Sequence, residues 1–455
     1  MSWMPNTRKN SMQDPYPVPV FTVPSQATVS VPGSKSITNR ALLLAALAQG
    51  NTRLENCLFS RDTEIMVTAL NELGIETTSD RGSKRIDVQG AGGNIPNRKA
   101  AINIGNSGTS ARFLTAMLAA CTDGDFTLDG DEAMRKRPIQ KLADTLASLD
   151  SQIDTTDGHF PIRIRSTGLS GGIAEVDATE SSQFVSALLM AAPLAKEPIE
   201  VRLSNPSIRR GYIDMSLAMM EQFGMPASIL GSHSDRYRIS PHAYHAPADS
   251  YLVEGDASAA SYFIALPFAV GGSITIEGVS KNSLQGDIAF ADLAASSGGH
   301  LNWDSNALTV SLPENVSPLQ FPPLDSDYYT FSDTFMTGAA LAPLANGPTR
   351  IEGIGHTRHQ ECDRIAAMVD GLTQTGQSTQ DTDSTLTVEP RPLQPATIET
   401  SEDHRIAMSF AILGSHDALK SGQSWMKIKD PLCCRKTFPA FFEVLESARQ
   451  QSLES

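Results

Sequence analysis

The segment from residue 67 to residue 90, VTALNELGIETTSDRGSKRIDVQG, contains a pattern that recurs along the whole chain. Apolar residues at helical spacing lead to a turn at Gly74, and two short strands with alternating apolar residues follow, separated by a polar turn. The same order of elements recurs in residues 142–166, 215–240, 290–312 and 365–390. The turns after the helices are about 75 residues apart, which is longer than a solenoid repeat. They fall near Gly74, Asp150, Gly224, Gly298 and Gly376.

Each unit is preceded by a second, more apolar helix, for example over residues 37–50, 110–124, 181–195 and 256–272. A sixth amphipathic helix, residues 438–451, is followed by no strands, so we expect its partner strand to come from residues 21–31. Six copies of a long α/β unit predict stacked α/β subdomains, divided three plus three between two similar domains. One domain would then be discontinuous, with residues 1–33 plus 255–455 in it and residues 34–254 forming an inserted domain.

Composition excludes several classes of protein. The 455 residues carry a formal net charge of −15, which disfavours nucleic acid and anionic membranes as partners. No stretch approaches the ~18 apolar residues of a membrane span, and the N-terminal 20 residues read as a flexible leader without a signal-peptide core. The five cysteines are odd in number, and Cys433 and Cys434 are adjacent, which indicates a reducing, cytoplasmic compartment.

Two helix starts in the first half resemble anion sites. In VSVPGSKSITNRALLL, residues 29–44, a turn at Pro32-Gly33 leads to a helix that Ser34 or Ser36 can cap, with Lys35 and Arg40 close to its N-terminus. In INIGNSGTSARFL, residues 102–114, Gly108 allows close approach to a ligand, and Thr109 or Ser110 can cap. The alternatives are a solvated basic turn and a plain capped helix.

Further candidates lie at other predicted helix starts. Arg135, Lys136 and Arg137 precede Pro138, which is expected to open a helix, and Ser181, Ser182 and Gln183 precede an apolar helix; simple capping also explains the latter group. The second half supplies charged groups at residues 361–364, 403–405 and 435–436. Asp333 is a lone carboxylate at a helix start and is either a cap or a catalyst. His404 could equally be a core histidine, and Cys362 a small packed residue.

Cofactor and metal motifs are absent from the sequence. No G-x-G-x-x-G follows a strand, no phosphate-binding P-loop occurs, and neither C-x-x-C nor H-E-x-x-H is present. We therefore expect no cofactor and no metal. The repeated architecture would direct the basic helix starts toward one cleft between the domains. Such a cleft suits a small, multiply anionic ligand, with Asp333 and Glu361 left as acid–base groups.

Nine ordered segments match a known family. The chain resembles the 5-enolpyruvylshikimate-3-phosphate synthases, or 3-phosphoshikimate 1-carboxyvinyltransferases, over about Val23 to Glu443. The resemblance implies an α/β fold of two similar domains, each of three repeated α/β units, in the inside-out α/β barrel of enolpyruvyl transferases. The matching segments are PGSKSITNRALLLAAL, GNSGTSARFL, DGDEAMRKRPI, SSQFVSALLM, YLVEGDASAASYF, LQGDIAFADL, QECDRIAAM, EDHRIAMSF and DPLCCRKTFPAFF.

The resemblance also implies a reaction of the shikimate pathway. Phosphoenolpyruvate would add to the 5-hydroxyl of shikimate 3-phosphate through a tetrahedral ketal, with loss of phosphate and without a cofactor, in a monomeric enzyme that the herbicide glyphosate targets. Asp333 looks like the base near the 5-hydroxyl, Glu361 like the acid–base group at the methylene carbon, and Lys35 like a catalytic residue shared by both substrates.

Binding residues follow from the same resemblance. Most contacts to shikimate 3-phosphate would lie in the inserted domain, and the acid–base groups and C-terminal phosphoenolpyruvate contacts in the discontinuous one. The implied contacts to shikimate 3-phosphate are Lys35, Ser36, Arg40, Ser181, Ser182, Gln183, Tyr212, Asp333, His356 and Gln360. The implied contacts to phosphoenolpyruvate are Lys35, Gly108, Arg137, Gln183, Arg364, Arg405 and Lys436.

Some positions depart from the commoner family pattern. His356 and Gln360 stand where many members have asparagine and lysine, Arg209 stands where a serine contact is usual, and Phe113 replaces a proline. These changes are expected to affect affinity and the response to glyphosate. The alternatives are a sister transferase acting on a UDP-aminosugar, which would need a reactive cysteine where Cys121 has no cationic neighbour, and an inactive anion-binding homologue.

Overall fold

The protein is described by a computed structural model that covers residues 12–179, 181–205, 210–230, 235–313 and 321–455. The chain divides into two compact units. The first unit comprises Met1–Ser30, Ser258–Glu277 and Ala289–Ser455, and the second comprises Val31–Ala257 and Gly278–Ile288. The domain boundaries expected from the sequence, after residues 33 and 254, stay a prediction, and Arg209 lies outside the described residues.

The second unit repeats helices and short strands. Its helices are α1 (Lys35–Leu47), α2 (Arg61–Glu72), α3 (Gly108–Ala120), α4 (Gln140–Ala147), α5 (Gln183–Ala191) and α6 (Gly211–Gln222), with 3-10 turns η1 (Met134–Lys136), η2 (Ala192–Leu194) and η3 (Gly286–Ile288). Its strands are β3 (Ala48–Glu55), β4 (Thr77–Asp80), β5 (Arg85–Ala91), β6 (Lys99–Asn103), β7 (Thr122–Asp129), β8 (Gln152–Thr156), β9 (His159–Thr167), β10 (Gly172–Val176), β11 (Ile199–Leu203), β12 (Ser228–Leu230), β13 (Arg236–Ile239), β14 (Tyr244–His245) and β15 (Tyr251–Leu252).

The first unit contains the same kinds of element. Its helices are α7 (Ala257–Val270), α8 (Ala289–Ser296), α9 (Phe335–Leu341), α10 (Arg364–Gln374), α11 (His404–Gly414) and α12 (Phe441–Glu454), with 3-10 turns η4 (Ser332–Thr334), η5 (Ala342–Leu344), η6 (Gly355–His359) and η7 (Pro431–Lys436). Its strands are β1 (Tyr16–Pro17), β2 (Ser25–Ser30), β16 (Gly272–Glu277), β17 (His300–Trp303), β18 (Ala307–Ser311), β19 (Ser326–Asp327), β20 (Thr349–Glu352), β21 (Ser378–Asp381), β22 (Leu386–Glu389), β23 (Ala396–Ile398) and β24 (Met426–Ile428).

One sheet pattern recurs among the described strands. A parallel pair is extended by two antiparallel strands that form a hairpin after an amphipathic helix. The sheets with this pattern are β14-β3-β5-β4, β6-β7-β9-β8, β10-β11-β13-β12, β2-β16-β18-β17 and β19-β20-β22-β21. The helices end in left-handed turns at the predicted positions, Gly74, Asp150, Gly224, Gly298 and Gly376, which all have positive φ.

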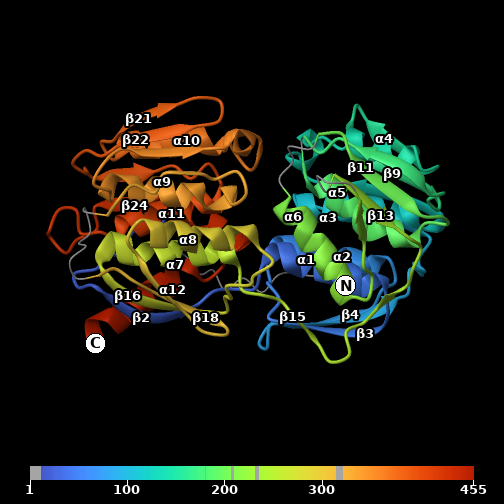
Figure 1. Ribbon diagram of the computed structural model, residues 1–455, viewed down its shortest axis with the longest axis horizontal. Coiled ribbons are helices and arrows are strands. Elements are labelled where there is room, and N and C mark those ends of the chain that lie inside the picture. Colours follow the sequence, from blue (N-terminus) through green and yellow to red (C-terminus); the bar gives the residue numbers. More distant parts are fainter. Residues whose placement is uncertain (1–11, 180, 206–209, 231–234, 314–320) are drawn as a thin grey trace. The chain divides into compact units, whose positions relative to one another are not determined.

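The apolar helix that precedes each α/β repeat lies in the core of its compact unit. Every residue of α3, α9 and α11 is buried, as is all of α5 except Gln183. A helix that is buried on all sides must be surrounded by other elements, so the sheets lie outside and these helices inside. In the first unit, α7, α9 and α11 lie between the sheet of β21 and β22 and the sheet of β16 and β18 (Figure 1).

Several local expectations need correction. Ser107, not Thr109 or Ser110, caps α3, and α4 begins at Gln140 rather than at Pro138. The partner strand expected for the last helix from residues 21–31 is β2, although within its sheet β2 pairs with β16. It contacts the last helix, because two α12 side chains accept hydrogen bonds from the backbone N–H groups of β2 at 2.9 and 3.0 Å. Within the described residues, none of the helices combines the length and apolar character needed to cross a bilayer.

Close packing between α10 and α11 gives a testable prediction. A methyl group added at Gly371 in α10 would overlap the ring of the buried Phe410 in α11. Helix propensity alone would favour alanine by ~1 kcal/mol, whereas overpacking costs about 1–3 kcal/mol. Gly371→Ala should therefore lower the melting temperature, while Gly347→Ala, whose methyl group would lie 3.7 Å from Pro323, should not. Equal melting temperatures for the two variants would contradict this account.

Candidate active site

Arg364 is the centre of a charged cluster in the first unit. It is the first residue of α10, and its side chain is only 2% exposed. Its Nε donates to Asp403 Oδ2 at 2.7 Å, and its two terminal nitrogens reach Asp333 Oδ1 at 3.1 Å and Glu361 Oε2 at 2.9 Å. One guanidinium therefore holds three carboxylates from three different segments of the chain.

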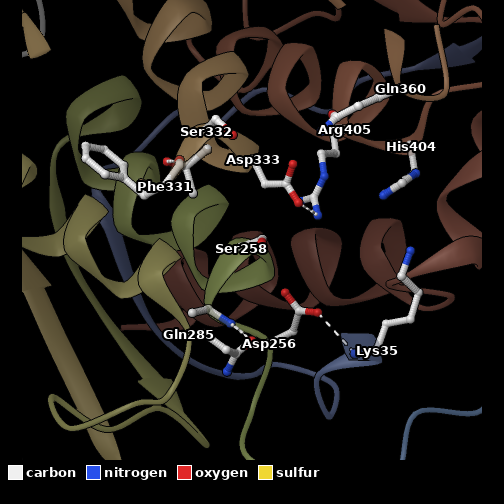
Figure 2. Close-up of polar contacts among 12 residues, drawn as sticks. Lys35, Asp256, Ser258, Gln285, Phe331, Ser332, Asp333, Gln360, His404 and Arg405 are labelled. Atoms are coloured by element: carbon white, nitrogen blue, oxygen red, sulfur yellow. Dashed lines mark hydrogen bonds and ion pairs between the residues drawn. The ribbon is translucent and has the colours of Figure 1, made fainter. Parts of the chain in front are cut away.

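Two more cations complete this cluster. Arg405 Nη2 donates to Asp333 Oδ2 at 2.8 Å, and Figure 2 shows the Asp333 carboxylate turned toward that guanidinium. Lys436 Nζ, at the end of η7, lies 2.8 Å from Glu361 Oε1. Asp333 and Glu361 therefore each contact two cations.

Burial and charge act in opposite directions on Arg364. Burial would lower the pKa of its guanidinium, but the carboxylates of Asp403, Glu361 and Asp333 raise that pKa above its ordinary value. The side chain therefore stays cationic although water is almost excluded from it. Asp403 is fully buried; the sequence placed it in the charged group 403–405 but assigned it neither a catalytic nor a substrate-binding role. Its only signal is its position directly before His404 and Arg405.

The loop before α10 adds two polar side chains. Gln360 Oε1 accepts a hydrogen bond from Arg364 Nη1. His356 Nε2 lies 2.8 Å from the hydroxyl of Ser332, the neighbour of Asp333. His404 is buried beside Asp403, with its Nδ1 3.7 Å from Oδ1 of that carboxylate. The predicted residues His356 and Gln360 thus belong to the same cluster as the predicted carboxylates.

Lys35 opens the other group of predicted residues, in the second unit. Ser34 caps α1 by accepting from Ile37 N at 3.4 Å, which places Lys35 at the first helical position. The Lys35 ammonium lies 3.7 Å from Asp62 Oδ2, and its backbone N–H donates to Asp256 Oδ2 at 3.4 Å (Figure 2). The sequence did not predict either of these two carboxylates as a site residue.

Arg40 is buried more deeply than a simple surface anion site would require. Its guanidinium lies over the rings of Phe113 and Tyr212, 5.1 and 5.6 Å from their centroids. It donates to Ser216 Oγ at 2.8 Å and to the carbonyl oxygen of Ser36 at 3.1 Å. Burial lowers its pKa to about 10, so it stays charged at neutral pH. A ligand contact would have to share these donors.

Gly108, Arg137 and Gln183 lie together in the second unit. A methyl group at Gly108, the first residue of α3, would lie 2.8 Å from Arg137 Nη1 and 3.9 Å from Gln183 Oε1. Gln183 is the first residue of α5, and its backbone N–H donates to Ser181 Oγ at 3.2 Å. Ser182 is the N-cap residue of α5, yet its side chain makes no capping hydrogen bond. Residues predicted from three separate motifs therefore meet at two helix starts.

Cys121 is not a reactive thiol. It is buried at the end of α3 and lies 3.4 Å from the carbonyl oxygen of Met117. Burial raises the pKa of this thiol to about 12, so it remains protonated at neutral pH. This environment disfavours the sister transferase that would need a reactive cysteine.

Removing the buried carboxylate gives a prediction about stability. Asp403→Asn keeps a side-chain oxygen that can cap α11 but leaves Arg364 with less compensating charge. The cost should be about 3 kcal/mol, measured by urea unfolding with the fluorescence of the buried Trp425. The exposed pair Lys429–Glu399 supplies the control: Glu399→Gln should cost below about 1 kcal/mol. Similar losses in both variants would show that burial of the Arg364 network does not matter.

Comparisons with known proteins identify the family of the chain. The family model of EPSP synthase (3-phosphoshikimate 1-carboxyvinyltransferase) matches residues 22–445. A 3-phosphoshikimate 1-carboxyvinyltransferase of Opitutus terrae is 43% identical over 449 residues, which cover 97% of this chain and 99% of the relative. One from Nostoc punctiforme is 38% identical over 439 residues, with coverages of 95% and 100%.

Solved structures show the same fold. EPSP synthase of Acinetobacter baumannii matches with a TM-score of 0.79 at 24% identity, over 94% of this chain and 97% of that one. The enolpyruvyl transferase NikO of Streptomyces tendae matches with a TM-score of 0.73 at 16% identity, over 94% and 96%. The expected α/β fold of the enolpyruvyl transferases is confirmed. Together with the matches over nearly the full length, this shows that the chain belongs to the EPSP synthase family.

Proposed function

We propose that this chain transfers the enolpyruvyl group of phosphoenolpyruvate to the 5-hydroxyl of shikimate 3-phosphate and releases phosphate. The observation that carries the proposal is the cluster in which Asp333 and Glu361 each contact two cations, since Arg364 reaches both carboxylates. Phosphoenolpyruvate brings a phosphate and a carboxylate, which need such cations. Acid–base groups beside anion-binding groups are what the addition and elimination steps require.

The chemistry assigns separate roles to the two carboxyl groups. In the addition step, Glu361 gives a proton to the methylene carbon of phosphoenolpyruvate while the 5-hydroxyl oxygen bonds to the adjacent carbon. Asp333 takes the proton that leaves the hydroxyl. In the elimination step, the carbon–oxygen bond to phosphate breaks as Glu361 removes a proton from the new methyl group. The proton that Asp333 took from the hydroxyl leaves with the departing phosphate, so both carboxyl groups return to their starting states. Protons balance over the cycle.

The cations divide between the substrates. In the first unit, Arg364, Arg405 and Lys436 would bind phosphoenolpyruvate. In the second unit, Lys35 would serve both substrates, and Gly108, Arg137 and Gln183 would meet phosphoenolpyruvate. Shikimate 3-phosphate would be held by Ser36, Arg40, Ser181, Ser182, Gln183 and Tyr212, with Asp333, His356 and Gln360 contributing from the first unit. That these residues converge in one cleft remains a prediction.

The reaction is tested by its requirement for two substrates. Phosphate release that needs both phosphoenolpyruvate and shikimate 3-phosphate would support the proposal. Release that needs a UDP-aminosugar instead would assign the chain to the sister reaction, and binding of both anions without release would identify an inactive homologue.

We also propose that the enzyme acts in the cytoplasm as a monomer, which cell fractionation and gel filtration would test. All five cysteines are free, which agrees with a reducing compartment.

Glu361→Gln tests the acid–base assignment. The amide keeps the shape of the side chain but cannot exchange a proton with carbon, so kcat should fall about 100-fold or more. The KM for phosphoenolpyruvate should change much less, because the three cations remain. The exposed Glu389 on β22 provides the control Glu389→Gln, which should keep wild-type kinetics. Wild-type turnover by Glu361→Gln would refute the assignment.

Gly108→Ala tests the phosphoenolpyruvate site of the second unit. The added methyl group would displace the guanidinium of Arg137 and crowd that of Arg112, and loss of one charge-assisted contact should raise the KM for phosphoenolpyruvate about 10-fold. Gly82→Ala, in an exposed turn of the same unit, is the matched control. An unchanged KM in Gly108→Ala would remove Arg137 from the proposed contacts.

A further inference from the structure

The loop from Ile354 to Asp363 carries several proposed site residues on little regular structure. It contains only the short turn η6 before α10 begins at Arg364. Glu361 lies in the part of this loop that follows η6. In the proposed reaction its carboxyl group must be placed accurately to exchange a proton with the methylene carbon of phosphoenolpyruvate. A reacting side chain on a loop needs other contacts that fix it, because a displacement of ~1 Å can cost ~100-fold in rate.

Arg358 links this loop to the turn between β21 and β22. Its Nη1 donates to both carboxylate oxygens of Asp363, at 3.0 and 2.8 Å. Its Nη2 donates to Asp381 Oδ2 at 2.7 Å and to the carbonyl oxygen of Thr382 at 2.7 Å. Its Nε donates to the carbonyl oxygen of Asp383 at 3.2 Å. All three nitrogens of the guanidinium are therefore engaged by protein atoms.

The turn that binds Arg358 is itself stabilised by hydrogen bonds. Thr382 N donates to the carbonyl oxygen of Thr385 at 3.1 Å, and the hydroxyls of these two residues lie 2.8 Å apart. The same turn also holds the start of the loop, because Ile354 N donates to the carbonyl oxygen of Ser384 at 3.1 Å. The loop is thus attached to a short, internally bonded hairpin at its beginning and, through Arg358, at its middle.

Asp363 connects Arg358 to the start of α10. Its Oδ1 accepts from Ala366 N at 3.0 Å, so the carboxylate that binds Arg358 is also the N-cap of the helix. Burial would raise the pKa of Asp363, but the hydrogen bond from Ala366 N and the guanidinium of Arg358 hold it below its ordinary value. Arg364 is the next residue, so whatever fixes the cap also fixes the start of Arg364.

We propose that Arg358 is a positioning residue for the reaction. Arg358 binds Asp363 and also the turn 381–383. These contacts anchor both ends of residues 359–362, and so they fix the positions of Glu361 and Arg364. The inference rests on the proposed function, in which those two residues act on phosphoenolpyruvate. Arg358 is not assigned a substrate contact, because its donors are already used. A lysine could replace it only in part, since an ammonium lacks the planar fork that reaches several acceptors at once.

Three variants test the inference by steady-state kinetics. Arg358→Ala should lower kcat about 10- to 100-fold, and kcat/KM for phosphoenolpyruvate should fall more than that for shikimate 3-phosphate. Arg358→Lys should recover only part of this loss. Asp381→Asn, which keeps the Asp363 cap and weakens only the link to the turn, should give a smaller loss in the same direction. Added guanidinium ion should restore part of the activity of Arg358→Ala but none of that of Glu361→Gln.

Arg350→Ala is the matched control. Arg350 lies in the same sheet, in β20, and pairs with Glu352 through an exposed guanidinium. Its loss should leave kcat unchanged. If the Arg358 and Asp381 variants melt at lower temperature yet keep wild-type kcat, the residue is merely structural and the inference is overturned. If Arg358→Ala does not fold, Arg358→Lys and Asp381→Asn decide by the same criterion. A wild-type protein without two-substrate phosphate release would instead overturn the proposed function, and the inference with it.

Discussion

The neutralisation of one buried guanidinium is the constraint on which the site in the first unit depends. Arg364 is almost inaccessible to water, so its charge must be balanced by carboxylates at short range. Those carboxylates come from η4, from the loop before α10 and from the start of α11. Satisfying Arg364 therefore brings three distant segments into one arrangement. The charge balance that allows Arg364 to be buried therefore also sets the spacing of Asp333 and Glu361, the two proposed acid–base groups.

Buried helices make such an arrangement possible. Because α3, α9 and α11 are enclosed on all sides, their first turns are held in fixed positions, and their N-terminal N–H groups need partners. Capping and site chemistry are then performed by neighbouring residues. Asp403 caps α11 and binds Arg364, while Ser34 caps α1 and is followed by Lys35. A site built from helix starts gains rigidity from the core, which a site on free loops would lack.

The sequence predicted the repeat well because helix and strand periodicities are local. The turns at Gly74 and its counterparts could be placed within a residue, and the apolar helices could be recognised as core. The sequence could not predict which strands pair, as β2 shows by joining β16, because pairing depends on distant segments. The sequence predicted the cationic site residues but not the buried carboxylates that contact them. Nothing local distinguishes Asp62, Asp256 or Asp403 from an ordinary cap or surface carboxylate, and only the folded chain shows each of them next to its cation.

The side chains at residues 356 and 360 are compatible with the same charge balance. Gln360 accepts a hydrogen bond from Arg364, which a lysine at that position could not do, since an ammonium has no acceptor. A lysine would instead add a fourth cation to a group in which Arg364, Arg405 and Lys436 already match three carboxylates. The glutamine therefore lets the loop rest against Arg364 without repulsion. His356, held by Ser332, supports the other end of the loop beside Asp333. The uncharged amide of Gln360 thus leaves the balance between these three cations and three carboxylates undisturbed.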